Sequence, residues 1–235
     1  MSRQWSGTLK TAETIRSGIP QAKIDYSAMS KDELASYYRG IHATAVAAGR
    51  DLVRRYDFSS CRSLLDVGGG SGGLAIAVTE ACPHLRATVV DLPTVTPITR
   101  RYVEEAGPTN RVEVLTADAV NGPLIGHFDL AVLLRVIHVF SPDQARRTLQ
   151  NVSQVIEPGG AIYIVGPVID NSRISPPATV GSNLHFINIF DEGQASTEQE
   201  LRDWLAEAGF VGFERTTLPG VQSIVTARKP GERSR

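Results

Sequence analysis

The stretch that decides the fold is Leu64-Leu65-Asp66-Val67-Gly68-Gly69-Gly70-Ser71-Gly72-Gly73. Its apolar first half is typical of a buried strand, and the glycines at 68, 70 and 73 have the spacing G-x-G-x-x-G. That spacing joins a strand to a helix and lets a ligand approach the backbone at the helix N-terminus. A purely structural turn is the weaker interpretation, because so many glycines cost backbone entropy on folding. The stretch predicts a nucleotide-type ligand, although the spacing alone also fits a dinucleotide.

Apolar segments alternate with helical segments after residue 60. Strands are expected over 63–67, 87–90, 112–115, 128–134, 161–165, 210–218 and 221–229, and helices over 73–81, 96–106, 142–156 and 197–208. Continuous apolar strands separated by helices predict a parallel sheet that is covered on both faces. The last two strands flank Pro219-Gly220 and can pair only as an antiparallel hairpin. The predicted fold is therefore α/β and Rossmann-like, with a mostly parallel seven-stranded sheet and a C-terminal antiparallel hairpin.

Residues 1–60 are expected to form a helical lead-in, because they contain no convincing strand. Ser30 and Glu33 have the spacing of a capping box, and the apolar residues after them recur at helical spacing to about Tyr56. We expect this lead-in to cover the pocket of a cofactor-binding catalytic domain over 61–229. Residues 230–235 are expected to form a polar tail.

Three acidic residues, Asp66, Asp91 and Asp118, lie at the ends of the first three predicted strands. The carboxyl ends of parallel strands meet at one edge of the sheet, where open α/β sheets bind ligands. Asp66 would repel a pyrophosphate at the glycine turn but favour a cationic group such as an ammonium. Asp91 can accept both hydroxyls of a ribose and Asp118 can recognise a purine amine, although either could instead cap a helix. Ammonium, ribose and adenine together describe S-adenosylmethionine (SAM); an NAD-dependent reductase is a rival that rests on the glycine spacing alone.

The composition excludes several classes of protein. The 235 residues carry 24 basic and 25 acidic side chains, a formal net charge of -1, so we expect no nucleic-acid partner. No apolar run is long enough to span a bilayer and we find no signal peptide, so we expect no membrane partner and a cytoplasmic location. The two cysteines, Cys61 and Cys82, and the five dispersed histidines lack metal-ligand spacing, so no metal is expected.

Five segments of the chain resemble one family of enzymes. They are the glycine turn at 65–72, Val90-Asp91-Leu92-Pro93, Ala117-Asp118, Leu133-Leu134-Arg135-Val136-Ile137-His138 and Glu157-Pro158-Gly159-Gly160. These segments are similar to the SAM-dependent O-methyltransferases typified by the plant caffeic acid enzyme and by bacterial antibiotic methyltransferases. The resemblance implies the class I methyltransferase fold with SAM as cofactor. The segment from Trp5 to Pro20 also resembles the lead into the family's catalytic domain, so we expect these residues to correspond to the catalytic domain alone, without the family's N-terminal winged-helix dimerisation domain.

The resemblance also implies roles for individual residues. Asp91 would hold the ribose, Leu92 would pack on the adenine, and Asp118 with Ala119 would bind its other side. His138 falls on the family's catalytic histidine, which deprotonates the acceptor hydroxyl. The expected cofactor-binding residues are Asp66, Gly68, Gly69, Gly70, Asp91, Leu92, Asp118, Ala119 and Arg135. The expected substrate-binding residues are His42, Phe140, His185, Phe186 and Phe190, with core packing as the alternative for the aromatic ones and His42 as a second candidate base.

The sequence departs from the family around His138. His138-Val139-Phe140 replaces the common His-Asp-Trp, and Gly166 and Ala195 stand where plant enzymes place two glutamates around the histidine. The expected function is transfer of a methyl group to a hydroxyl of a small, aromatic, specialised metabolite, with a possible homodimer. The alternative is a SAM-binding enzyme that catalyses a non-methylating reaction, such as decarboxylation, hydroxylation or pericyclic rearrangement.

Overall fold

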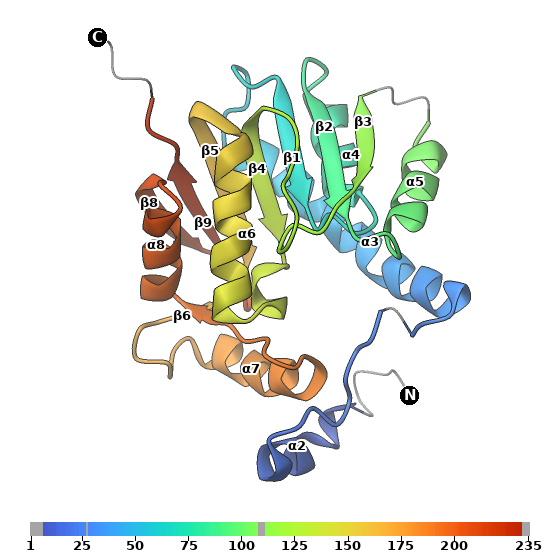
Figure 1. Cartoon of the computed structure of the whole chain (residues 1–235), viewed down its shortest axis with the longest axis vertical. Coiled ribbons are helices and arrows are strands. Elements are labelled where there is room, and N and C mark those ends of the chain that lie inside the picture. Colours follow the sequence, from blue (N-terminus) through green and yellow to red (C-terminus); the bar gives the residue numbers. More distant parts are fainter. Residues whose placement is uncertain (1–6, 27, 108–110, 232–235) are drawn as a thin grey trace.

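A seven-stranded sheet forms the centre of the molecule (Figure 1). The computed structural model describes residues 7–26, 28–107 and 111–231. The strands lie in the order β3-β2-β1-β4-β5-β9-β8. Their bounds are β1 Ser63–Val67, β2 Arg86–Asp91, β3 Val112–Thr116, β4 Phe128–Leu134, β5 Ile156–Gly166, β8 Val211–Thr217 and β9 Ser223–Arg228.

The pairing of the strands confirms the predicted sheet. Strands β1 to β5 pair in parallel, and β9 is antiparallel to both β5 and β8. The structure differs from the prediction at β5, which begins at Ile156 rather than at residue 161. Helix α6 (Pro142–Val155) runs directly into this strand, and the pairing with β4 is irregular between Phe128 and Leu130. Pro158-Gly159-Gly160 therefore lies within the strand and does not separate it from the helix.

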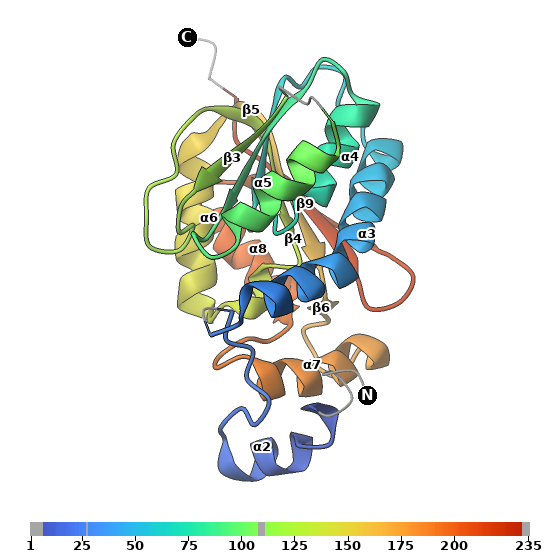
Figure 2. The ribbon, with the colours of Figure 1, turned by 90° about the vertical axis from the view of Figure 1, so that its right-hand side faces the viewer.

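Helices cover both faces of the sheet (Figure 2). On one face, α6 and α8 (Glu198–Glu207) pack over Leu65 and Leu133. On the other face, α3 (Lys31–Arg55) and α4 (Gly73–Ala81) pack over Leu64. Helix α5 (Thr96–Glu105) packs beside β2 and β3. Neighbouring residues of β1 thus enter different halves of the core, as the two-residue repeat of a strand requires.

Helix α3 begins where the sequence predicts. The Ser30 hydroxyl accepts a hydrogen bond from the Glu33 backbone N–H at 3.3 Å, and the Glu33 carboxylate accepts one from the Ser30 N–H at 3.0 Å. This capping box satisfies two N–H groups that the first turn of a helix leaves without partners. The helix ends at Arg55, one residue before the predicted end, and its buried face includes Tyr38 and Leu52.

Several further elements, whose bounds the sequence did not predict, lie beyond the carboxyl ends of the strands (Figure 1). They are α2 Thr11–Ser17, the 3-10 helix η1 Ile137–Val139, β6 Val168–Ile169, α7 Pro177–Ile189 and β7 Ser196–Thr197. The Thr14 hydroxyl donates to the Asn188 side-chain oxygen at 2.5 Å, and the Ala22 N–H donates to the Asn188 carbonyl at 3.0 Å. These bonds attach the N-terminal segment to α7. Trp5 and residues 232–235 of the expected tail lie outside the described residues.

Among the described residues, no helix is both long enough and apolar enough to cross a membrane. The same residues contain no group of three or more His, Cys, Asp or Glu side chains that could hold a metal ion.

Candidate active site

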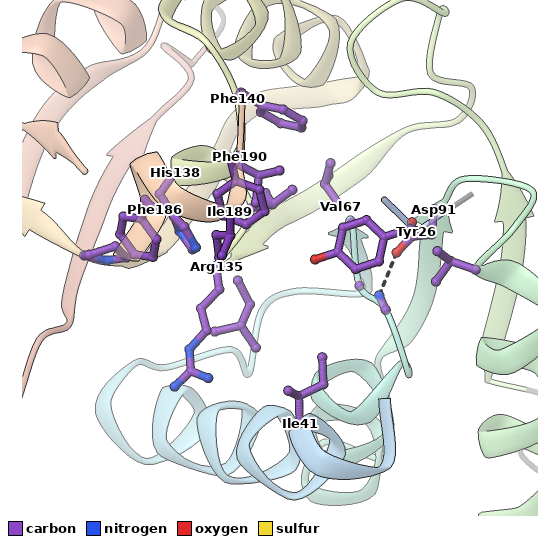
Figure 3. Close-up of a pocket in the computed structure, with 18 of the residues that line it drawn as sticks. Tyr26, Ile41, Val67, Asp91, Arg135, His138, Phe140, Phe186, Ile189 and Phe190 are labelled. Atoms are coloured by element: carbon purple, nitrogen blue, oxygen red, sulfur yellow. Dashed lines mark hydrogen bonds between the residues drawn. The ribbon is translucent and has the colours of Figure 1, made fainter. Parts of the chain in front are cut away.

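A cavity of about 1370 Å³ opens at the carboxyl edge of the sheet. The glycine turn after β1 and the ends of β2 and β4 form its floor, and residues of α3 and α7 form its walls. Figure 3 shows Tyr26 and Asp91 on one side of this cavity and His138, Phe186 and Arg135 on the other. The cavity thus has two ends with different chemistry.

The glycine turn presents bare backbone to the cavity. Gly68 and Gly70 have φ angles of 63° and 59°, which residues other than glycine rarely adopt. A Cβ on Gly70 would lie 2.8 Å from a ring carbon of Tyr38, and one on Gly68 would lie 2.8 Å from Val136. Both the backbone conformation and the close neighbours therefore require glycine at these two positions.

Asp91 connects the end of β2 to the glycine turn. One carboxylate oxygen accepts a hydrogen bond from the Gly70 N–H at 2.8 Å, and the other accepts one from the Leu92 N–H at 2.8 Å. Burial raises the pKa of Asp91, and these two backbone hydrogen bonds act in the opposite direction. Each oxygen retains a lone pair for a ligand hydroxyl. Leu92, next to it, is 42% exposed and lines the cavity.

Asp66 does not lie where the sequence argument expects it. Its side chain is fully buried beneath the turn and does not line the cavity; a Cβ on Gly69 would lie 2.7 Å from its carboxyl carbon. Neither carboxylate oxygen makes a hydrogen bond among the described residues. Burial raises the pKa of Asp66 to about 7, the charge of Asp91 adds to this, and the nearby N–H of Ala75 lowers it without completing a hydrogen bond. The expected direct contact with an ammonium group is thus wrong for this structure, because β1 directs the side chain towards α4.

Asp118 and Ala119 line the cavity beyond β3. One Asp118 oxygen accepts from the N–H groups of Val120 and Asn121 at 2.8 and 3.2 Å, and the other accepts from the Asn121 side-chain amide at 2.8 Å. Burial works against ionisation here, but the hydrogen bonds of Asn121 and Val120 outweigh it and hold the pKa of Asp118 below its ordinary value. Asp118 therefore organises its own turn and also faces the cavity; no helix begins at this turn, so the helix-capping alternative is wrong for Asp118, and recognition of a purine amine stays a prediction.

His138 lies in η1, at the other end of the cavity. Its ring stacks on Phe186, with the ring centres 4.5 Å apart and 29° between the planes, and it lies 6.2 Å from Phe190. Burial lowers the pKa of His138 to about 4, and the electrostatic influence of Arg135 and of the neighbouring His185 acts in the same direction. Among the described residues, neither ring nitrogen has a hydrogen-bond partner. The imidazole is therefore neutral at physiological pH and can accept a proton, but it is a weak base.

Neither of the two positions at which the family has a glutamate carries an acidic side chain here, and the surroundings of the two positions differ. A Cβ on Gly166 would lie 3.9 Å from Nδ1 of His138, so a longer side chain there could reach the ring. Ala195 is fully buried, does not line the cavity, and donates its N–H to the Asn183 side-chain oxygen at 2.6 Å. No carboxylate orients His138 within the described residues.

Aromatic side chains surround the acceptor end. Phe140, His185, Phe186 and Phe190 all line the cavity, and three of them lie on or directly after α7. Burial lowers the pKa of His185, so this second imidazole is also neutral. His42 is the exception among the expected substrate residues, because it does not line the cavity. Its Nδ1 lies 2.9 Å from the Ser71 hydroxyl, and its ring stacks on Tyr102 at 4.2 Å.

Comparison with known proteins shows to which family this chain belongs. The sequence profile of the O-methyltransferase domain matches residues 15–211. The chain belongs to the O-methyltransferase domain family.

Relatives of this O-methyltransferase domain come from bacteria and mammals. The chain is 27% identical over 227 residues to the tetracenomycin polyketide synthesis 8-O-methyl transferase TcmO of Streptomyces glaucescens, covering 96% of this chain and 67% of that protein. It is 30% identical over 214 residues to acetylserotonin O-methyltransferase of Bos taurus, covering 90% of this chain and 61% of that protein. The chain thus spans roughly two thirds of the length of these relatives.

Solved structures share the fold of this O-methyltransferase domain. PigF, solved with S-adenosylhomocysteine, superposes with a TM-score of 0.83 at 23% identity, covering 96% of this chain and 69% of that chain. Human N-acetylserotonin methyltransferase in complex with SAM superposes with a TM-score of 0.81 at 23% identity, covering 97% and 67%. These findings confirm the class I methyltransferase fold, and SAM is the cofactor of the family. They do not favour the NAD-dependent reductase that the glycine spacing left open.

The site of this O-methyltransferase domain fits SAM on its own geometry. The glycine turn contributes backbone to the lining of the cavity, and Asp91 offers two oxygens at the adjacent strand end. The acidic residues Asp91 and Asp118 lie at the same end of the cavity and can accept from hydroxyl and amine donors.

Sequence reasoning missed the tyrosines of the lead-in. Tyr26, Tyr37 and Tyr38 line the cavity, and the hydroxyls of Tyr26 and Tyr37 lie 3.2 Å apart. Burial raises the pKa of Tyr26 above its ordinary value. The only sequence signal was that aromatic residues recur in a segment expected to cover the pocket. Thr44 and Gln222, which contact Arg135, gave no signal at all.

Proposed function

We propose that this chain is the catalytic part of an enzyme that transfers the methyl group of SAM to a hydroxyl of a small, aromatic, specialised metabolite. The observation that carries the proposal is that one cavity holds the glycine turn with Asp91 at one end and His138 among phenylalanines at the other. A planar acceptor suits aromatic walls, and a base beside it suits a hydroxyl substrate. TcmO and acetylserotonin O-methyltransferase, by their names, act as O-methyltransferases.

The cofactor-binding part of the proposal assigns SAM to the acidic end. The backbone at Gly68–Gly70 would receive the methionine part, Asp91 the ribose hydroxyls, and Leu92, Asp118 and Ala119 the adenine. Arg135 lies at the junction of the two ends, because it follows β4 and precedes Val136, which packs against Gly68. Asp66 would act through its charge from beneath the turn and not by contact.

The catalytic part of the proposal rests on His138 and the aromatic wall. When bound, SAM supplies an electrophilic methyl carbon that forms a bond to the acceptor oxygen as the bond to sulfur breaks. Phe186 and Phe190 would hold the acceptor ring, and such orientation can contribute roughly 7–11 kcal/mol. Nδ1 of His138 lies towards Gly166, which leaves Nε2 to accept the hydroxyl proton. General-base assistance is worth about 10²–10⁴-fold, so a weak base still adds to the rate.

The test is product formation by the wild-type protein and by His138→Gln. The chain is incubated with SAM and a panel of hydroxylated naphthalenes, quinones and benzoates, and products are detected by mass spectrometry. We expect a product that is heavier by one methylene, formed with one equivalent of S-adenosylhomocysteine, and a slower rate for His138→Gln with unchanged SAM affinity. Tight SAM binding without any methylated product across the panel would contradict the proposal.

The lack of a carboxylate at Gly166 and Ala195 favours a second candidate function. A SAM-binding enzyme that decarboxylates, hydroxylates or rearranges its substrate would not need a strong base beside the acceptor. The same experiment separates the two candidates, since a non-methylating enzyme changes the substrate without releasing S-adenosylhomocysteine. A homodimer remains a prediction. Ile15 on α2 and Ile19 just after this helix are exposed by 62% and 63%, respectively, and light scattering of the purified chain would test it.

A further inference from the structure

Ser71 is the only residue with a hydroxyl group in the glycine turn at 68–73. It lines the cavity directly after Gly70, and 2% of its surface is exposed. Within the described part of the chain its hydroxyl makes one hydrogen bond, with Nδ1 of His42 at 2.9 Å. A hydroxyl has one donor and two acceptor positions, so this bond leaves two of the three for a ligand.

Gly73 allows His42 to approach the turn this closely. It is the last glycine of the G-x-G-x-x-G spacing and the first residue of α4. A Cβ on Gly73 would lie 3.0 Å from the His42 carbonyl oxygen and 3.1 Å from Nδ1 of the same residue. Further along α3, a Cβ on Gly49 would lie 2.7 Å from the Leu74 carbonyl oxygen. Two glycines thus bring α3 close to α4, and one of them brings His42 to the glycine turn.

The imidazole of His42 is fixed by an aromatic contact. It stacks on Tyr102 of α5, with the ring centres 4.2 Å apart and 13° between the planes. The Arg101 guanidinium lies 5.4 Å from the centre of the Tyr102 ring, and Arg101 pairs with Glu105 at 3.5 Å. Burial lowers the pKa of His42, and the charge of Glu105 acts in the opposite direction, so the ring is neutral at physiological pH. A neutral ring in a fixed orientation therefore determines the direction of the Ser71 hydroxyl.

The backbone of the turn does not depend on His42. The Gly70 N–H donates to the Asp91 carboxylate at 2.8 Å, and the Gly70 carbonyl accepts from the Thr99 hydroxyl at 2.5 Å. These two side chains come from β2 and α5, and both hold the residue directly before Ser71. The hydrogen bond with His42 therefore acts on the Ser71 side chain.

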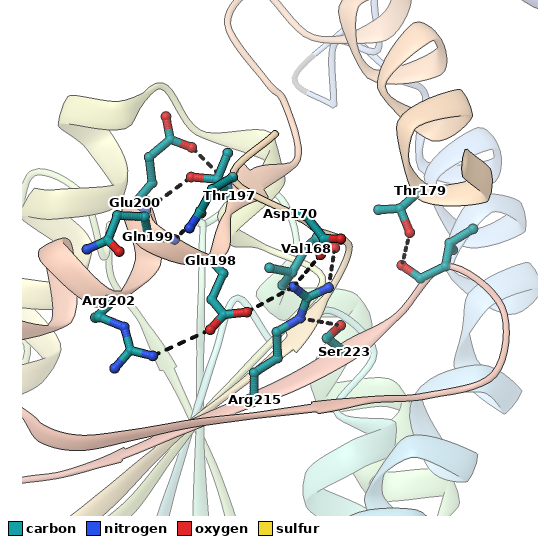
Figure 4. A network of polar contacts seen from close by, with 12 residues as sticks. Val168, Asp170, Thr179, Thr197, Glu198, Gln199, Glu200, Arg202, Arg215 and Ser223 are labelled. Atoms are coloured by element: carbon teal, nitrogen blue, oxygen red, sulfur yellow. Dashed lines mark hydrogen bonds and ion pairs between the residues drawn. The ribbon is translucent and has the colours of Figure 1, made fainter. Parts of the chain in front are cut away.

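Ser223 shows how the chain uses a buried serine with a structural role (Figure 4). It is also 2% exposed, and its hydroxyl accepts a hydrogen bond from Nε of Arg215 at 3.2 Å. Arg215 also pairs with Asp170 at 3.0 Å and with Glu198 at 3.2 Å. Ser223 does not line the cavity. Ser223 and Ser71 are thus equally buried and each contacts one nitrogen-bearing side chain, but of the two only Ser71 faces the ligand site.

We infer that the Ser71 hydroxyl binds the amino-acid end of SAM and that His42 is a positioning residue, which holds this hydroxyl through Nδ1. This inference rests on the proposed function, in which the backbone at Gly68–Gly70 receives the methionine part. The amino-acid end carries an ammonium and a carboxylate group, and a hydroxyl can accept from the first or donate to the second. The ribose is assigned to Asp91, so Ser71 should matter for the amino-acid end and not for the adenosine.

The test compares two ligands that differ only at this end. S-adenosylhomocysteine carries the complete amino acid, whereas 5′-methylthioadenosine has a methyl group on the same sulfur. Calorimetry measures both dissociation constants. We expect Ser71→Ala to weaken S-adenosylhomocysteine binding by about three- to tenfold, the effect of one hydrogen bond, and to change methylthioadenosine binding by less than about twofold. Ser223→Ala is the matched control, which should lower the free energy of unfolding and leave both dissociation constants unchanged.

Two variants of His42 separate positioning from folding. His42→Phe keeps an aromatic ring against Tyr102 but removes Nδ1, so it should weaken S-adenosylhomocysteine binding, though no more than Ser71→Ala does. In a chain that already carries Ser71→Ala, His42→Phe should have no further effect, because both changes interrupt one connection. His42→Asn places an amide group near the position of Nδ1 and should restore part of the affinity. Urea unfolding shows that each variant is folded.

The contrary results are distinct. The inference is wrong if Ser71→Ala binds S-adenosylhomocysteine as the wild-type protein does, or if it loses affinity for both ligands equally. Should His42→Phe weaken binding to the same degree with and without the Ser71 hydroxyl, His42 acts through the fold and is not a positioning residue for Ser71. A wild-type protein that binds neither ligand would instead refute the proposed function.

Discussion

Replacing Asp66 by asparagine should stabilise the protein, and the gain should depend on pH. The folded chain holds a fully buried carboxyl group that makes no hydrogen bond to any described residue, and its pKa is about 7 against 3.8 for an ordinary Asp. As the pH rises above 4, the unfolded chain loses this proton first, so the stability of the wild-type protein falls until the folded group ionises near pH 7. At 1.36 kcal/mol per pH unit, the gap between the two pKa values corresponds to about 4 kcal/mol.

The Asp66→Asn variant removes this loss. Near pH 4 both side chains are neutral and unpaired, so the wild-type and variant free energies of unfolding should be similar. The difference should then grow with pH in favour of the variant and level off above about pH 7, at up to about 4 kcal/mol. Urea unfolding followed by circular dichroism at several pH values measures it, provided that the denaturant slope stays constant.

Asp129 provides the matched control for this prediction. Its carboxylate accepts hydrogen bonds from the N–H groups of Arg62 and Ser63 at 2.6 and 2.9 Å. Asp129→Asn replaces a carboxylate that already accepts two backbone hydrogen bonds by a neutral amide, which weakens these bonds. The variant should therefore be less stable than the wild-type protein by about 1–3 kcal/mol. Stability curves of wild type and Asp66→Asn that run parallel between about pH 4 and pH 8 would refute the reasoning about Asp66. If the charge of Asp66 also supports the cofactor, Asp66→Asn should bind S-adenosylhomocysteine more weakly at pH 8.

Further predictions concern the turn, the base and the buried ion network. Gly70→Ala should weaken SAM binding and lower stability by about 1 kcal/mol or more, because it places a Cβ 2.8 Å from the Tyr38 ring at a φ of 59°; calorimetry and thermal unfolding measure the two effects. The pKa of His138 is about 4, so its protonation should produce no fall in kcat between about pH 8 and pH 6, and an inflection in this range that disappears in His138→Gln would contradict this. Gly166→Glu should raise the pKa of His138, seen by NMR titration, since its carboxylate would favour the imidazolium. Arg215→Gln should lower the free energy of unfolding by about 1–3 kcal/mol without changing SAM affinity, because it removes hydrogen bonds to Asp170 and Glu198 far from the turn.

The sequence was sufficient to predict the sheet and a cavity at the carboxyl ends of its strands. Apolar strands between helices predicted parallel pairing, and Pro219-Gly220 predicted the hairpin, because both signals are local and repeat along the chain. The start of β5 was wrong because Pro158-Gly159-Gly160 normally ends an element, whereas here α6 passes directly into the strand.

The directions of individual side chains were harder to predict than their positions. Asp66 follows Leu65 on β1, so it shares the face of Leu64 and points towards α3 and α4 instead of the cavity. His42 is one residue from Ile41 on α3, a rotation of about 100°, so Ile41 lines the cavity while His42 stacks on Tyr102. The repeat of each element could have indicated both errors. The left-handed backbone of Arg135 had no sequence signal, because it depends on the tertiary structure around β4.

The departures around His138 bear on how strong a base the acceptor needs. A glutamate beside the histidine would strengthen the base for a neutral phenol, but the same negative charge would repel an acceptor that is already ionised. Glycine at 166 and alanine at 195 are therefore consistent with an acceptor whose hydroxyl ionises readily. A nucleophile that is already ionised needs little help from a base, and charges of opposite sign on the oxygen and the sulfonium cancel as the methyl group moves. Gly166→Glu should then improve the turnover of a weakly acidic naphthol relative to that of a nitronaphthol, which ionises more readily; equal effects on the two rates would contradict this explanation.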